Sequence, residues 1–152
     1  MRICLVYPPY GSGRRSKYFP FGLAYVGASL RQKGHEVSVV DMEGDDLDCG
    51  RATRAVCSAR PDTIGFGGMI TRFRFVRELA GEIRRVLPGS FLVAGNSGAT
   101  TLPDLYLRSC GLDAVVIGEG ENTTAELAAA LECGGEWRGI PGLAFLSGGS
   151  VE

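Results

Sequence analysis

The chain has 152 residues, of which 45% are hydrophobic and 22% charged, and its formal net charge is −1. This length and apolar content predict one folded domain with a core of its own, and they exclude a disordered chain. Nucleic-acid-binding domains usually carry a strong basic excess, so nucleic acid is not expected as a partner. The sequence has no apolar stretch of about 18 residues and no signal-peptide pattern, so we expect a cytoplasmic protein without membrane contact.

Five short runs of β-forming residues recur along the chain at similar intervals. Most of them are continuously apolar, which is typical of parallel strands that are covered on both faces. The predicted strands are Arg2–Tyr7, Glu36–Asp41, Thr63–Phe66, Phe91–Ala94 and Asp113–Ile117.

Helical patterns separate these strands. The clearest covers Thr71–Leu87, where apolar residues repeat every three or four positions and Arg72 lies off the apolar stripe. Further helices are predicted around Leu23–Leu30, Arg51–Ser58, Pro103–Cys110 and Leu127–Leu131. This alternation predicts an α/β fold of the Rossmann-like type, in which a doubly wound, five-stranded parallel sheet lies between two helical layers.

The segments that follow the predicted strands are rich in glycine, serine, threonine and asparagine, whereas the segments before the strands are short. Gly67 and Gly68 follow the third strand, Gly95–Gly98 the fourth and Gly118–Gly120 the fifth. Ligands of such sheets bind at the carboxyl ends of the strands, and residues without a Cβ atom let a ligand approach the backbone. We therefore expect a glycine-lined binding site for a bulky or flat ligand at this edge.

Motifs of several common enzyme classes are absent. No GxGxxG follows the first strand, no P-loop pattern occurs, and the cysteines form no CxxC or CxxxCxxC that would hold an iron–sulfur cluster. The single histidine, His35, precedes the second strand at the opposite edge, and we interpret it as a surface turn residue. The acidic residues of Glu43–Asp48 are interpreted as a solvated loop. The sequence thus favours binding over catalysis.

Six segments, taken in order, carry a more specific pattern. They are VYPPY, FGLAYVGASLRQKGHEVSVVD, PDTIGFGGMIT, FLVAGNSGATTLPDL, DAVVIGEGENT and IPGLAF. Together they resemble the N-terminal cobalamin (vitamin B12)-binding domain of cobalamin-dependent radical SAM enzymes. The resemblance implies a flavodoxin-like fold, in which the nucleotide tail of cobalamin enters between the loops after the first and the third and fourth strands. The corrin ring would then lie across the carboxyl edge of the sheet.

The resemblance also implies which residues hold the cofactor. The family's loop after the fourth strand, commonly GGPHAT, corresponds to Gly95–Thr100, where Asn96 replaces the second glycine and Gly98 the histidine. The DxHxxG sequence that supplies a histidine to cobalt is absent, so the cobalamin would be base-off without a protein histidine ligand. The implied cofactor-binding residues are Pro9, Tyr10, Gly11, Gly67, Gly68, Met69, Thr71, Gly95, Asn96, Ser97, Gly98, Thr100, Gly118, Glu119 and Gly120.

The same resemblance gives the chain a binding role inside a larger enzyme. Without CxxxCxxC the chain is expected not to be catalytic alone, and SAM and a [4Fe-4S] cluster would belong to a C-terminal radical SAM domain outside it. That parent enzyme would transfer methyl groups. Residues 1–140 would form the cobalamin-binding domain, and residues 141–152 would begin a hairpin or linker. The alternatives are a stand-alone flavodoxin-like domain that binds a nucleotide or flavin, and an interaction domain without a ligand.

Overall fold

The computed structural model describes residues 1–10 and 19–152, and its centre is a six-stranded sheet with the strand order β2-β1-β3-β4-β5-β6. The strands are β1 (Arg2–Tyr7), β2 (Glu36–Asp41), β3 (Thr63–Phe66), β4 (Phe91–Ala94), β5 (Ala114–Val116) and β6 (Leu143–Ala144). Strands β1 to β5 are parallel, and their order is that of flavodoxin-like folds. The predicted α/β, flavodoxin-like fold is therefore confirmed.

The prediction of five strands is wrong by one, because β6 pairs antiparallel with the edge of β5. The strand lies in the segment 141–152, where the sequence predicts the start of a hairpin or linker, and it pairs along the free edge of β5. After β6 the chain forms a small antiparallel pair, β7 (Leu146–Ser147) and β8 (Ser150–Val151). The boundary at residue 140 stays a prediction.

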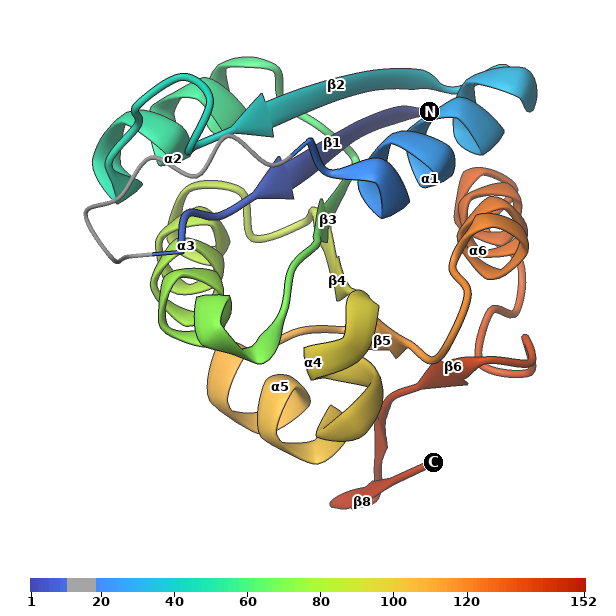
Figure 1. The fold of residues 1–152 in the computed structure, drawn as a ribbon. Coiled ribbons are helices and arrows are strands. Elements are labelled where there is room, and N and C mark those ends of the chain that lie inside the picture. Colours follow the sequence, from blue (N-terminus) through green and yellow to red (C-terminus); the bar gives the residue numbers. More distant parts are fainter. Residues whose placement is uncertain (11–18) are drawn as a thin grey trace.

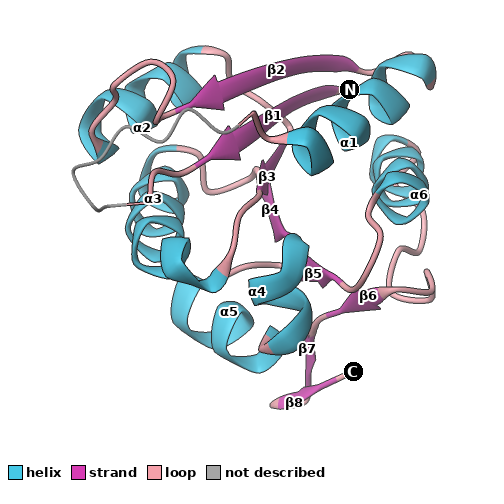
Figure 2. Ribbon diagram, in the orientation of Figure 1, coloured by secondary structure: helices cyan, strands magenta, loops and turns pink. Residues whose placement is uncertain are grey.

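Helices cover both faces of the sheet, as Figures 1 and 2 show. They are α1 (Phe21–Gln32), α2 (Cys49–Ser58), α3 (Phe73–Val86), α4 (Asn96–Thr101), α5 (Pro103–Cys110) and α6 (Glu121–Glu132), with a 3-10 turn, η1, at Ile70–Arg72. Helices α1 and α6 pack side by side on one face, and α2, α3 and α5 on the other. Among the described residues, no helix is long and apolar enough to cross a membrane.

The sequence prediction is accurate for the strands and less so for the helices. The first four strands have the predicted bounds, while β5 lacks the outer residues Asp113 and Ile117. Helix α4 was not expected, because its sequence NSGATT contains few good helix formers. The predicted helix over Thr71–Leu87 is divided into η1 and α3.

The central strand β3 presents very different side chains to its two faces. Ile64 and Phe66 point into the larger core cluster, which α2, α3 and α5 cover. The alternate positions Thr63 and Gly65 face the layer of α1 and α6, since side chains alternate along a strand. One face of β3 is thus filled, and the other carries small side chains.

His35 corrects the expectation of a surface turn histidine. It lies at the predicted amino edge, just before β2, but only 7% of the residue is exposed. Its Nδ1 atom is 3.4 Å from the N-terminal nitrogen of Met1 and 3.6 Å from a carboxylate oxygen of Glu132. The terminal ammonium also lowers the pKa of Glu132. Contacts with residues far away in the sequence therefore bury this histidine, and the local pattern could not indicate them.

The packing of β3 leads to a stability prediction. Ile64→Ala should lower the free energy of unfolding by about 2–5 kcal/mol, because the side chain is fully buried and its removal leaves a cavity. Val39→Ala on the edge strand β2 is the control, since Val39 is 49% exposed, and it should cost less than about 1 kcal/mol. Urea unfolding measures both, and equal losses would contradict the assignment of the core.

Candidate functional site

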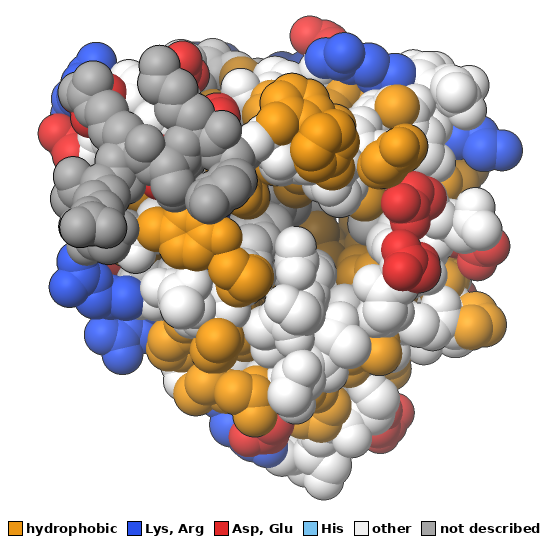
Figure 3. Space-filling model, viewed as in Figure 1, with side chains coloured by type: hydrophobic (Ala, Val, Ile, Leu, Met, Phe, Trp, Pro, Cys, Tyr) orange, Lys and Arg blue, Asp and Glu red, His pale blue; other side chains and the backbone are white. Residues whose placement is uncertain are grey.

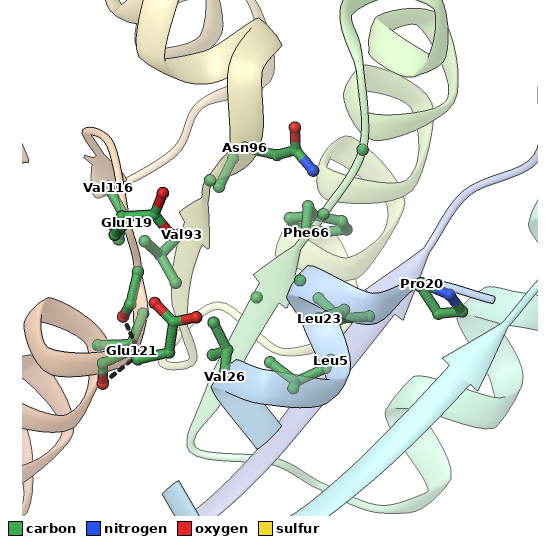
Figure 4. Close-up of a pocket in the computed structure, with 18 of the residues that line it drawn as sticks. Leu5, Pro20, Leu23, Val26, Phe66, Val93, Asn96, Val116, Glu119 and Glu121 are labelled. Carbon is green, nitrogen blue, oxygen red and sulfur yellow. Dashed lines mark hydrogen bonds between the residues drawn. The ribbon is translucent and has the colours of Figure 1, made fainter. Parts of the chain in front are cut away.

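A cavity of about 570 Å³ lies between the sheet and the pair of helices α1 and α6. Leu5 and Val93 of the sheet contribute to its floor, and Leu23 and Val26 of α1 and Leu127 of α6 to its walls. Figure 4 shows Leu5, Leu23, Val26 and Val93 gathered around this space. The volume lies in the range of small-molecule and cofactor pockets, which are mostly apolar and largely preformed.

The pocket follows the small residues of β3. Thr63, Gly65 and Gly67 lie two residues apart on the same side and all line it. A Cβ atom at Gly65 would lie 2.9 Å from Cδ2 of Leu5, and one at Gly67 would lie 2.8 Å from Cδ1 of Leu23. A side chain at Gly65 or at Gly67, just after β3, would therefore force the neighbouring leucine to shift. The two glycines leave the space over this strand to the leucines and to the pocket that they line together.

The mouth of the pocket is made of the loops at the carboxyl ends of β3, β4 and β5. The Thr100 hydroxyl accepts a hydrogen bond from the Gly118 backbone N–H at 3.0 Å, which ties α4 to the loop after β5. Glu119 and Glu121 line one margin, and Figure 3 shows acidic side chains beside a hollow with hydrophobic side chains on the other side. The mouth thus combines backbone groups, hydroxyls and carboxylates around an apolar interior.

Asn96 adopts a backbone conformation that favours glycine. Its φ is +79°, and its side-chain oxygen accepts a hydrogen bond from the Ser97 backbone N–H at 2.5 Å. Asparagine visits the left-handed region more readily than other residues with a Cβ atom. This conformation explains why asparagine is tolerated at position 96, which corresponds to the second glycine of the GGPHAT loop described above.

Arg72 forms a buried side wall next to the pocket. The guanidinium carbon lies 3.8 Å from the centre of the Tyr7 ring and 4.0 Å from that of Tyr10, and Nη2 is 3.4 Å from a carboxylate oxygen of Glu43. Burial raises the pKa of the Tyr7 hydroxyl, and the nearby Arg72 cation opposes this shift. The loops after β1 and β2 and the 3-10 turn after β3 are joined at this point.

This arrangement corrects two sequence interpretations. The sequence pattern predicts Arg72 on the polar side of a helix, yet its side chain is fully buried at the end of η1. The sequence pattern predicts Glu43 in a solvated loop, yet only 9% of its side chain is exposed. The partners come from separate loops, so a cation and a carboxylate that look solvated in the sequence compensate each other in the fold.

Most of the residues that the sequence singled out line the pocket. Those that line it are Gly67, Gly68, Gly95, Asn96, Ser97, Thr100, Gly118, Glu119 and Gly120. Pro9, Tyr10, Met69, Thr71 and Gly98 do not line it, and Gly11 lies outside the described residues. Gly98 instead packs under η1, where a Cβ atom would lie 2.7 Å from the Ile70 backbone nitrogen.

The sequence patterns do not indicate the inner part of the pocket. Leu5, Thr63 and Gly65 belong to strands, and Leu23 and Val26 to a helix, so their apolar patterns indicated a core. The informative signal was the alternation of small residues in Thr63–Gly67, which a filled core would not need.

The sequence profile of the B12 binding domain matches residues 10–128 of the chain. The chain belongs to the B12-binding domain family. An uncharacterized methyltransferase, PH0819, of Pyrococcus horikoshii is 33% identical over 99% of this chain, which covers 34% of that protein. The anaerobic magnesium-protoporphyrin IX monomethyl ester cyclase of Synechocystis is 32% identical over 95% of this chain, which covers 30% of that protein.

Solved structures agree with this assignment. The radical S-adenosylmethionine methyltransferase TsrM of Kitasatospora setae, with tryptophan and a SAM analogue bound, superposes with a TM-score of 0.86 and is 27% identical. This match covers 99% of the present chain and 29% of TsrM. A second TsrM structure, with cobalamin and a [4Fe-4S] cluster bound, gives a TM-score of 0.85 at 25% identity, with coverages of 99% and 28%. The chain is thus a B12-binding domain similar to those of cobalamin-dependent radical SAM methyltransferases, and it spans about a third or less of these proteins.

The backbone of Asn96 gives a prediction that separates conformation from hydrogen bonding. Asn96→Ala should lower the free energy of unfolding by about 1 kcal/mol, because alanine is strained at positive φ. Asn96→Gly loses the same side-chain hydrogen bond but relieves the strain, so the unfolding free energy should stay close to that of the natural protein. Denaturant unfolding compares the two variants, and equal losses would show that the hydrogen bond, not φ, decides this position.

Proposed function

We propose that this domain binds cobalamin across the carboxyl edge of its sheet, as one part of a larger radical SAM enzyme that transfers methyl groups. The observation that carries the proposal is the apolar slot along β3, which opens between glycine-rich loops in a chain of the B12-binding family. The relatives named above support the enzyme class, and SAM and the [4Fe-4S] cluster would be held by another part of the parent protein.

The residues of the pocket fit the chemistry of a corrinoid with a nucleotide tail. The tail ends in a flat, largely apolar base, and the slot offers apolar walls from Leu5, Leu23 and Val93 with no side chain at Gly65 and Gly67. The corrin ring carries amide side chains on its rim, and Ser97 and Glu119 at the mouth offer hydroxyl and carboxylate partners. When bound, the corrinoid would supply its cobalt as the carrier of a methyl group.

We propose further that the cobalamin is base-off and that no histidine of this domain coordinates cobalt. His35 precedes β2 at the amino edge, whereas the mouth of the pocket lies at the carboxyl edge. A tail that enters the slot along β3 carries its base away from the corrin ring.

A substitution at the mouth tests the binding site. Gly95→Leu should weaken binding of hydroxocobalamin by about tenfold or more, a loss of about 1.4 kcal/mol, because the new side chain enters the pocket. Its stability should hardly change, since Gly95 has an extended backbone with φ of −140° and its Cβ atom would meet only Val116 at 3.7 Å. Gel filtration with absorbance of the bound cofactor gives the affinity, and thermal unfolding gives the stability.

The control for Gly95→Leu is Gly89→Leu. Gly89 lies in the exposed turn before β4 at the amino edge, where a Cβ atom would have no neighbour within 4 Å. This variant should bind hydroxocobalamin as the natural protein does. Equal loss of binding in both variants, or no binding by the natural full-length protein, would refute the proposed site.

His35 provides a separate test of the cobalt ligand. His35→Ala should lower thermal stability, because a buried side chain with polar contacts is removed. The absorption spectrum of the bound cobalamin should remain base-off and unchanged. A shift of the cobalt absorption bands in this variant would mean that the histidine reaches the metal and that the proposed orientation is wrong.

A further inference from the structure

The inner end of the pocket contains a buried hydroxyl without a hydrogen-bond partner. Thr63 begins β3, is 5% exposed and lines the pocket, and its Oγ1 atom has no partner among the described residues. A hydroxyl in such a place costs free energy unless something pairs with it. A buried polar atom left unpaired beside a cavity points to a ligand that completes it.

The side chains around the Thr63 hydroxyl are apolar and buried. Ile3 of β1, Leu30 of α1 and Ala128 of α6 line the same inner part of the pocket, and each is at most 3% exposed. Their side chains offer no hydrogen-bonding atom. Of the residues that the structure describes, a ligand group that reaches this end therefore meets these apolar side chains and the Thr63 hydroxyl.

We propose that the Thr63 hydroxyl donates a hydrogen bond to a ring nitrogen of the terminal base of the bound ligand, and so contributes to selection of that base. This inference rests on the proposed function, because it takes the slot as the place of the nucleotide tail. A planar heteroaromatic base matches the enclosure, since its faces are apolar and its ring nitrogen accepts a hydrogen bond. In a base-off corrinoid that nitrogen is released from cobalt and needs a new partner.

The test compares two corrinoids on the full-length protein. Hydroxocobalamin carries the base, whereas cobinamide lacks the whole nucleotide. Thr63→Val keeps the shape of the side chain and removes the hydroxyl. It should weaken hydroxocobalamin binding roughly three- to tenfold, the usual effect of one hydrogen bond, and leave cobinamide binding unchanged. Thr63→Ser should bind hydroxocobalamin like the natural protein.

Thermal unfolding without ligand gives a second readout, in which Thr63→Val should not lose stability although it loses ligand affinity. Thr63→Val should have the same or a higher melting temperature than the natural protein, because an unpaired buried hydroxyl is replaced by a methyl group. Thr53→Val is the matched control on the other face of the sheet, where the Thr53 hydroxyl donates to Glu82 at 2.6 Å. That variant should melt at a lower temperature and bind both corrinoids normally.

Three results would overturn the inference while leaving the proposed function intact. They are unchanged or tighter hydroxocobalamin binding by Thr63→Val, an equal loss for hydroxocobalamin and cobinamide, and a loss in Thr63→Ser as large as that in Thr63→Val. A natural protein that binds neither corrinoid would instead refute the proposed function, and the inference would fall with it.

Discussion

The absence of side-chain volume on one face of β3 is the constraint on which the site depends. In a doubly wound sheet, helices normally pack directly on the central strands and fill both layers. Gly65 and, just after the strand, Gly67 add no side chain on the side of α1 and α6, while Ile64 and Phe66 pack into the larger core cluster on the other side. The largest core cluster thus lies in one layer, and the cavity lies in the other beside two smaller clusters.

The walls of the cavity are held in place by contacts that lie outside it. Arg72 stacks between Tyr7 and Tyr10 and faces Glu43, so that three loops at the carboxyl edge share one buried cation. On the opposite wall, the Ser29 hydroxyl of α1 donates to the Glu121 carbonyl of α6 at 3.1 Å. A pocket whose walls are fixed before binding loses less conformational entropy when a ligand enters.

The fold could be predicted from the sequence because each strand is marked by the pattern of its own few residues. Each of the five parallel strands is a short β-forming run, and its position determines which loops meet at the carboxyl edge. The glycine-rich loops that line the mouth followed from this arrangement. Residues whose environment depends on distant partners were not predictable in this way. His35, Arg72 and Glu43 are examples, because their burial comes from other loops and from the chain terminus.

The interior of the site could be predicted only in part from the sequence. Thr63 and Gly65 stand in a predicted strand, and small residues at alternate positions indicate that one face is not filled. Only the structure shows that α1 and α6 leave a space above them and that the Thr63 hydroxyl has no partner there among the described residues. A period-two pattern of small residues in a central strand is thus a sequence signal for a buried ligand slot.

The central claim is that cobalamin enters the layer between the sheet and helices α1 and α6. Methyl NMR of the full-length protein during a hydroxocobalamin titration tests it most directly. The account predicts that the methyl resonances of Leu5 and Val93, which line the slot, shift strongly, while those of Ile64 and Leu92 in the opposite core stay nearly unchanged. Equal shifts in both layers, or binding without any shift of Leu5 and Val93, would contradict it.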